Sequence, residues 1–139
     1  MLPDVNVWVA LTVDKHVHHP AARKWYEALP LSASLVFCRQ TQLGLFRILS
    51  TTAVMGLETL TQVQCWSIYD QWVATGQLAW ATEPLGLETQ LRRLTAGTTK
   101  SPKGWMDAYL AALAISAGLT LVTFDKALAA KAAKALLLG

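Results

Sequence analysis

The chain has 139 residues, of which 53% are hydrophobic and only 15% are charged. This length suits one domain with a real core, and the low charge leaves too few polar groups to cover its surface, which indicates a subunit or partner interface. Lysine and arginine outnumber the acids by twelve to nine, a modest excess that suits a polyanionic substrate without requiring one.

The cysteines, the apolar runs and the N-terminus argue against a disulfide-rich, a membrane-spanning or a secreted protein. Cys38 and Cys65 lie in apolar segments without metal-ligand spacing, so we expect reduced core thiols rather than a disulfide framework. The longest charge-free run, residues 108–124, is interrupted by Gly118 and is shorter than the roughly 20 apolar residues of a membrane helix. With no signal peptide ahead of the first element, the sequence predicts a cytoplasmic protein that does not cross a membrane.

The N-terminal residues predict a strand that ends at Asp4, followed by a helix at residues 7–11. Pro3 suits the start or edge of a strand. Asp4 then lies at the carboxyl end of that strand, although it and Asn6 also suit a helix cap. Both interpretations of Asp4 stay open on this stretch alone.

Three histidines, His16, His18 and His19, precede a predicted helix at residues 21–29. A zinc site is one interpretation, but structural zinc takes four ligands and no cysteine or acid cluster lies nearby. A loop that leads into a helix with Pro20 at its first position is the stronger interpretation.

The middle of the chain alternates short apolar strands with helices. Gln42 follows the second predicted strand, at the same kind of position as Asp4, but it can offer only a neutral oxygen. The predicted elements are strands at residues 35–38 and 78–80, helices at 41–49 and 87–94, a helix that begins after Thr59 or Thr61, and loops at 51–57 and 95–103.

Residues 104–125 predict a helix and a strand of matching length. The helix, with Asp107 in its first turn, advances about 15 Å to residue 117 at roughly 1.5 Å per residue. Gly118 suits the left-handed stop of a helix, and the strand at residues 119–123 returns about 16 Å. Asp125 therefore arrives near Asp107. A last helix at residues 126–135 and an edge strand at 136–138 complete the prediction.

This alternation predicts a single α/β domain over residues 1–139, with a largely parallel sheet and helices on both faces. Asp4 and Asp125 follow strands, and parallel strands share a carboxyl edge, so both acids can converge there with Asp107. Three carboxylates repel one another, and an all-oxygen cluster suits Mg²⁺ or Mn²⁺. Such a site hydrolyses phosphodiesters with metal-activated water. Thr123 could orient the Asp125 carboxylate or a water molecule.

Four segments of this chain resemble the successive motifs of PIN-domain ribonucleases. They are Asp4-Val-Asn6, Thr41 to Arg47, Trp105 to Leu110 with Ala111 and Ala112, and Leu121 to Asp125. The chain is similar over nearly its whole length to the VapC toxins of bacterial toxin–antitoxin pairs.

The resemblance implies an α/β/α sandwich with a short, mostly parallel sheet, Mg²⁺- or Mn²⁺-dependent endonuclease action on RNA, a VapB-like antitoxin and a homodimer. It implies catalytic roles for Asp4, Asp107 and Asp125, which would bind the metal. The family's second acid is commonly a glutamate, and Gln42 takes its place here. Asn6 and Thr123 would support the site.

Two other classes of function stay open. Gln42 favours a nuclease-like module that binds RNA or a protein without cutting. A phosphatase of the haloacid-dehalogenase type also begins with an aspartate after its first strand, but it requires an aspartate at the position of Asn6 and a later pairing of lysine with an acid, neither of which is evident.

Overall fold

A computed structural model describes residues 1–98 and 100–139 of the chain. Within this part, every strand is short and pairs in parallel with its neighbour, in a three-stranded sheet β1-β4-β5 and a two-stranded sheet β2-β3. The strands are β1 (Leu2–Pro3), β2 (Leu35–Phe37), β3 (Leu78–Trp80), β4 (Leu121–Thr123) and β5 (Ala135–Leu137).

The two sheets meet at the N-terminus of the chain. Val36 N donates a hydrogen bond to Met1 O at 2.8 Å, and the N-terminal ammonium donates one to Ser34 O at 2.8 Å. The strands therefore follow one another in the order β3-β2-β1-β4-β5. The winding reverses between β1 and β4, and open α/β sheets bind ligands at such a reversal, beyond the carboxyl ends of the strands.

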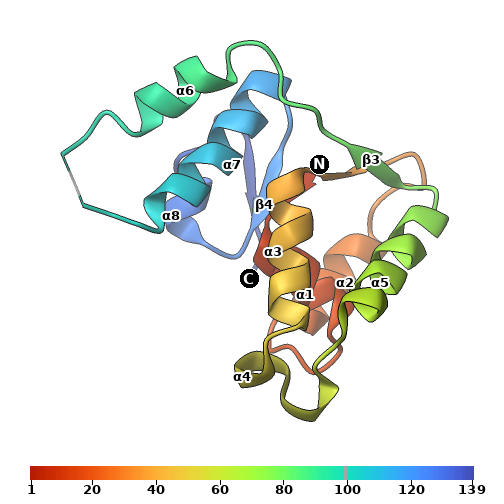
Figure 1. The fold of residues 1–139 in the computed structure, drawn as a ribbon. Coiled ribbons are helices and arrows are strands. Elements are labelled where there is room, and N and C mark those ends of the chain that lie inside the picture. The colour runs from red at the N-terminus through yellow and green to blue at the C-terminus, as the bar shows by residue number, and fades with distance from the viewer. Residues whose placement is uncertain (99) are drawn as a thin grey trace.

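Helices lie on both sides of the strands (Figure 1). One group comprises α1 (Val5–Thr12), α2 (His19–Glu27), α3 (Arg39–Leu49) and α5 (Gln62–Ala74), with the short α4 (Thr52–Met55) and a turn of 3-10 helix (Gly56–Glu58) at its far end. The other group comprises α6 (Leu87–Leu94), α7 (Gly104–Ala117) and α8 (Lys126–Ala129). The predicted α/β sandwich is therefore observed.

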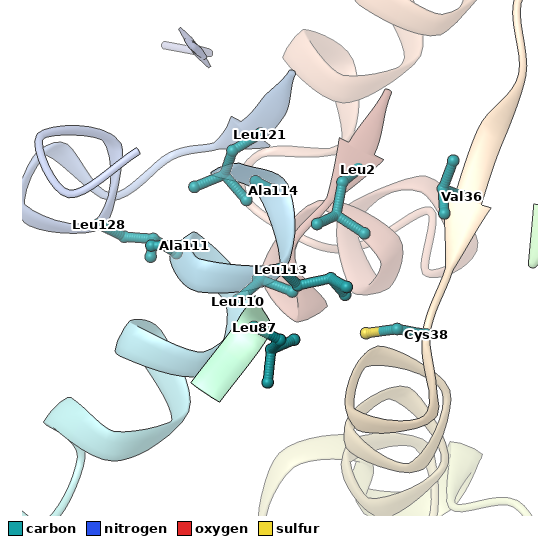
Figure 2. Close-up of a cluster of buried hydrophobic side chains, with 10 residues drawn as sticks. All are labelled: Leu2, Val36, Cys38, Leu87, Leu110, Ala111, Leu113, Ala114, Leu121 and Leu128. Atoms are coloured by element: carbon teal, nitrogen blue, oxygen red, sulfur yellow. The ribbon is translucent and has the colours of Figure 1, made fainter. Parts of the chain in front are cut away.

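Each helical layer has its own core because side chains alternate along β2. Leu35 and Phe37 pack with Trp8 of α1, whose ring stacks on Phe37 at a centroid distance of 3.8 Å. Val36 and Cys38 point the other way, toward Leu113 of α7 (Figure 2). A strand that is buried on both faces has a continuous run of apolar residues in the sequence, and this run predicts the strand at residues 35–38.

The helix predicted at residues 126–135 is wrong beyond Ala129. The chain leaves α8 there, and residues 135–137 form β5 against β4, where Leu121 pairs with Ala135. Backbone pairing with a buried strand overrides the helical preference of an alanine-rich segment. The loop predicted at residues 51–57 also differs, because it contains α4.

The prediction for residues 104–125 is largely confirmed. Helix α7 ends at Gly118, which has the left-handed angles φ 66° and ψ 25°, and Leu119 N donates back to Ala114 O at 2.8 Å. The strand is shorter than predicted, since β4 begins at Leu121. No helix in the described part of the chain is long and apolar enough to cross a membrane.

Candidate active site

A cleft of about 560 Å³ opens at the reversal between β1 and β4. Asp4, Asp107 and Asp125 all line it, together with residues along α3 from Gln40 to Ile48. The topology thus brings the three acids that the sequence singled out to one cleft, although Asp4 lies far from Asp107 and Asp125 along the chain.

Asp4 is the most buried of the three acids, with a residue exposure of 4%. Val7 N donates to its Oδ1 at 2.8 Å, and Thr123 Oγ1 donates to its Oδ2 at 2.5 Å. Burial raises the pKa of Asp4 above its usual value, the negative charge of Asp125 adds to the rise, and the hydrogen bonds oppose it. Asp4 both caps α1 and faces the cleft, so the two interpretations of this residue hold together.

Asp125 also combines a cap with a place in the cleft. Its Oδ1 accepts hydrogen bonds from Ala127 N at 2.7 Å and Leu128 N at 3.1 Å, at the start of α8. Thr123, which is fully buried, accepts a hydrogen bond from Asp125 N at 2.9 Å while it donates to Asp4. One threonine hydroxyl therefore links the backbone that carries Asp125 to the Asp4 carboxylate.

Asp107 lies in the first turn of α7, as predicted, and faces a cation that sequence reasoning missed. Lys131 Nζ is 3.7 Å from Asp107 Oδ2, and both side chains are about one third exposed. A helix that continued to residue 135, as predicted, gave no reason to expect Lys131 near Asp107. The turn after Ala129 brings Lys131 back to the start of α7.

Gln42 does not line the cleft. It is 2% exposed, and its Oε1 accepts a hydrogen bond from Arg39 Nη1 at 2.5 Å. The α3 side chains that do reach the cleft include Gln40 and Arg47, and Gly44 lies between them. These three positions follow the spacing of one helix face, from which Gln42 is turned away. That periodicity is the signal that could have identified Gln40 and Arg47.

Gln40 connects the two helices that border the cleft. Its Nε2 donates to Met106 O at 3.1 Å, which ties the start of α3 to the start of α7. Its Oε1 is buried without a hydrogen-bond partner among the described residues. Asn6, which the sequence placed in a supporting role, is exposed at the rim of the same cleft.

The histidines lie outside this cleft. The ring of His18 stacks on Phe124 at 4.3 Å between centroids, and His19 Nδ1 is 2.8 Å from Ala10 O. Within the described residues, no three histidine, cysteine or acidic side chains are grouped closely enough to hold a metal ion. This finding gives the zinc interpretation of His16, His18 and His19 no support, and it shows that the three acids share a cleft rather than a closed coordination sphere.

Comparisons with a family model and with known proteins identify the same family. Residues 1–134 match the model of the PIN domain. Ribonuclease VapC41 of Mycobacterium tuberculosis is 40% identical over 131 residues, which cover 91% of this chain and 90% of that protein. The chain belongs to the VapC-type PIN-domain ribonucleases. Ribonuclease VapC29 of the same organism is 33% identical, over 93% of this chain and 88% of that protein.

Solved structures agree on the fold of this VapC-type chain. VapBC2 from Rickettsia felis, crystallised with a DNA fragment from its promoter, matches with a TM-score of 0.70 over 99% of this chain and 98% of that one, at 14% identity. VapC20 of Mycobacterium tuberculosis, described as a toxin that cleaves the sarcin–ricin loop, matches at 0.69 over 93% and 92%, with 15% identity. The predicted PIN fold and the VapC resemblance are therefore confirmed.

Proposed function

We propose that this chain is a Mg²⁺- or Mn²⁺-dependent endoribonuclease and the toxin of a VapBC-type toxin–antitoxin pair. The observation that carries the proposal is that Asp4, Asp107 and Asp125 line one cleft at the reversal of the sheet. The likeness to proteins named ribonucleases supports RNA as the substrate.

The chemistry of the cleft suits a hard divalent cation. Its acids offer only oxygen atoms, and Asp4 is an acid buried next to the charge of Asp125, an arrangement that a cation would stabilise. Because Mg²⁺ usually keeps several water molecules, carboxylates that share a cleft without enclosing a point are compatible with it. When bound, such a cation polarises a phosphate oxygen and lowers the pKa of a bound water molecule.

Residues of this chain would position the carboxylates and the phosphodiester. Thr123 holds Asp4 and the backbone of Asp125 in register, so that the ends of β1 and β4 present both carboxylates to the cleft. Arg47, which lines the cleft from α3, offers a guanidinium to a phosphodiester. Gln42 would act only indirectly, because its contact with Arg39 lies outside the cleft.

Cleavage of an RNA panel tests this function. We expect the purified protein to cut RNA in Mg²⁺ or Mn²⁺ and to stop when EDTA removes the metal. Asp107→Asn should reduce the rate by at least about a hundredfold, the scale of losing one electrostatic contact in the transition state. Asp70→Asn, an exposed aspartate on α5 that lies outside the cleft, is the matched control and should cut like the wild type. Equal cleavage by Asp107→Asn would reject the assignment.

One observation favours the alternative of a PIN-fold module that binds without cutting. Helix α3 gives the cleft Gln40 and Arg47, but no carboxylate. A site with one acid fewer than the family pattern would bind RNA and cleave it weakly or not at all. Retained RNA binding without metal-dependent cleavage of any RNA would select this alternative.

The partners follow from the same proposal. A VapB-like antitoxin is supported by the structural neighbours, which include VapBC2 and the FitAB pair. The FitAB pair matches with a TM-score of 0.63 over 96% of this chain.

A homodimer is supported by exposed apolar side chains on α5, namely Val63, Trp66 and Val73. Light scattering of the purified chain should give twice the monomer mass, and a monomer would reject the homodimer.

A further inference from the structure

A second cleft, of about 800 Å³, lies beside the acidic one. Its described lining includes Leu94 at the end of α6, Lys100, Ser101 and Pro102 ahead of α7, Trp105 in the first turn of α7, and Lys131. Its volume is in the range of sites that hold small ligands, so it has room for a nucleobase. The proposed catalytic chemistry makes no use of it.

The lining has the composition of a nucleic-acid subsite. Trp105 is 60% exposed, and no other aromatic ring in the described part of the chain stacks on it. Lys100 and Lys131 provide positive charge, and none of the described lining residues is acidic. An exposed indole beside lysines offers a stacking surface and phosphate contacts, which together bind single-stranded nucleic acid.

The first turn of α7 separates the two clefts. Trp105 lines the second cleft, and Asp107, two residues later, lines the acidic cleft. Residues two apart point to opposite sides of a helix, so one turn serves both. Lys131 joins the clefts, because it lines the second one while its Nζ is 3.7 Å from Asp107 Oδ2.

We propose that this second cleft binds a nucleotide of single-stranded RNA next to the scissile phosphate, with its base stacked on Trp105 and its phosphates held by Lys100 and Lys131. The inference rests on the proposed ribonuclease function and names the part of the chain that holds the substrate beside the cut. A protein partner for the cleft is disfavoured because two lysines and an open aromatic ring suit phosphates and a base.

The test measures RNA binding without cleavage. Fluorescence anisotropy of a short labelled single-stranded RNA of mixed sequence is recorded in EDTA, with each variant's melting temperature as a check of folding. Trp105→Ala should weaken binding about tenfold, the scale of losing one stacked base. Trp105→Phe should retain most of the affinity, whereas Trp105→Leu should not, because leucine keeps apolar bulk without a ring. Leu31→Ala, at an almost fully exposed apolar side chain outside both clefts, is the control and should bind like the wild type.

The salt dependence of RNA binding distinguishes the lysines from Trp105. Lys100→Ala and Lys131→Ala should each reduce the slope of log affinity against log salt by about 0.7, the value for one lost phosphate contact on a single strand. Trp105→Ala should leave that slope unchanged, and its effect should disappear on an abasic oligonucleotide. Lys24→Ala, on the exposed side of α2, is the control for the lysines.

The outcomes separate this inference from the proposed function. Wild-type binding by Trp105→Ala, while the wild type still cleaves RNA in Mg²⁺, would overturn the inference and leave the function standing. Weakened binding by the Trp105 and lysine variants of a protein that never cleaves would support the second cleft as an RNA-binding site, and it would reject both the nuclease and the position of this site next to a scissile phosphate. Unchanged RNA affinity with weakened binding of a purified antitoxin would assign the cleft to a protein partner and overturn the inference.

Discussion

At Asp4, the ionised carboxylate that the proposed metal site requires conflicts with burial. The residue is 4% exposed, and its pKa is raised mainly by burial, with Asp125 adding to the effect. The folded chain therefore holds the Asp4 proton more tightly than the unfolded chain does. The stability linked to this proton is complete at pH values below the usual pKa of an aspartate and is lost as the pH rises through the raised value.

Asp4→Asn should therefore stabilise the metal-free protein while it impairs cleavage. Asparagine cannot ionise, and its amide can accept from Val7 N and donate to Thr123 Oγ1. Near neutral pH in EDTA, we expect a gain of about 1 kcal/mol, or about 3 °C in melting temperature. Scanning calorimetry across the acid range should show the gain vanish as the pH falls below the usual pKa of an aspartate. A lower melting temperature near neutral pH would mean that the charge stabilises the fold.

Gly44 marks the close approach of α3 to the start of α1. A Cβ atom at this position would lie 2.5 Å from Val5 Cγ2, well inside van der Waals contact. Overpacking of this kind costs about 1–3 kcal/mol, whereas alanine gains about 1 kcal/mol over glycine in helix propensity. The overlap is the larger effect, because the valine methyl is held on a stiff, branched side chain.

Gly44→Ala should lower the free energy of unfolding by up to about 2 kcal/mol, the difference between these two effects. The same substitution in a Val5→Ala background should have the opposite sign, since the overlap is gone and only the helix propensity remains. Urea unfolding of the four proteins of this double-mutant cycle measures both effects. Equal effects in the two backgrounds would exclude Val5 as the cause.

At the scale of elements, the stop of α7 at Gly118 sets the position of β4. The left-handed backbone at Gly118 lets the chain reverse, and the hydrogen bond from Leu119 N to Ala114 O closes the end of the helix. Helix α7 carries Asp107 at its start, and the strand that follows leads to Asp125. Both acids face the same cleft because the helix and the strand run side by side in opposite directions.

Gly118→Ala should destabilise the protein by about 1 kcal/mol, because a side chain is strained at positive φ. Chemical denaturation measures the loss. Gly97→Ala is the matched control: a Cβ atom there meets nothing within 4 Å, and its φ lies outside the left-handed range. If both alanines had the same effect, backbone strain at Gly118 would not be its source.

At the scale of the whole molecule, the strand order β3-β2-β1-β4-β5 creates the cleft. Asp4 and Asp125 are neighbours only because β4 returns to pair with β1, with Asp4 N donating to Val122 O at 2.9 Å. Residues of α3 and of α7 line the cleft beyond the ends of these two strands. A cation bound here would join parts of the chain that the fold brings together and that separate on unfolding.

Millimolar Mg²⁺ should therefore raise the melting temperature of the wild type. A ligand that binds only the folded state stabilises it by mass action, by about 2.7 kcal/mol at a hundred times its dissociation constant. Asp107→Asn should show a smaller rise, and Asp70→Asn should match the wild type. A melting curve of the wild type that Mg²⁺ does not change would count against a metal site in this cleft.

Much of the arrangement of elements could be predicted from local patterns. The run at residues 35–38, the acid at the start of α7 and the glycine after it each have a local physical cause, and the structure has each of them in place. The errors in the predicted secondary structure occur where pairing with a distant segment sets the local conformation. The edge strand predicted at residues 136–138 is present as β5, one residue earlier, but the helix predicted up to residue 135 ends at Ala129. Ala135 belongs to the strand because it pairs with β4, and no local property of this alanine-rich segment reveals that pairing.

From the sequence alone, Asp4, Asp107 and Asp125 could be predicted to converge at one edge of a parallel sheet, because strand ends and helix starts can be located from spacing. Which other side chains share the cleft with these acids depends on the packing of the folded chain. Gln42 is turned away while Gln40 and Arg47 face the acids, and Lys131 reaches Asp107 from beyond a helix that ends early. Side-chain direction and contacts across the chain depend on how helices pack, and that packing is set by the whole fold rather than by any one segment.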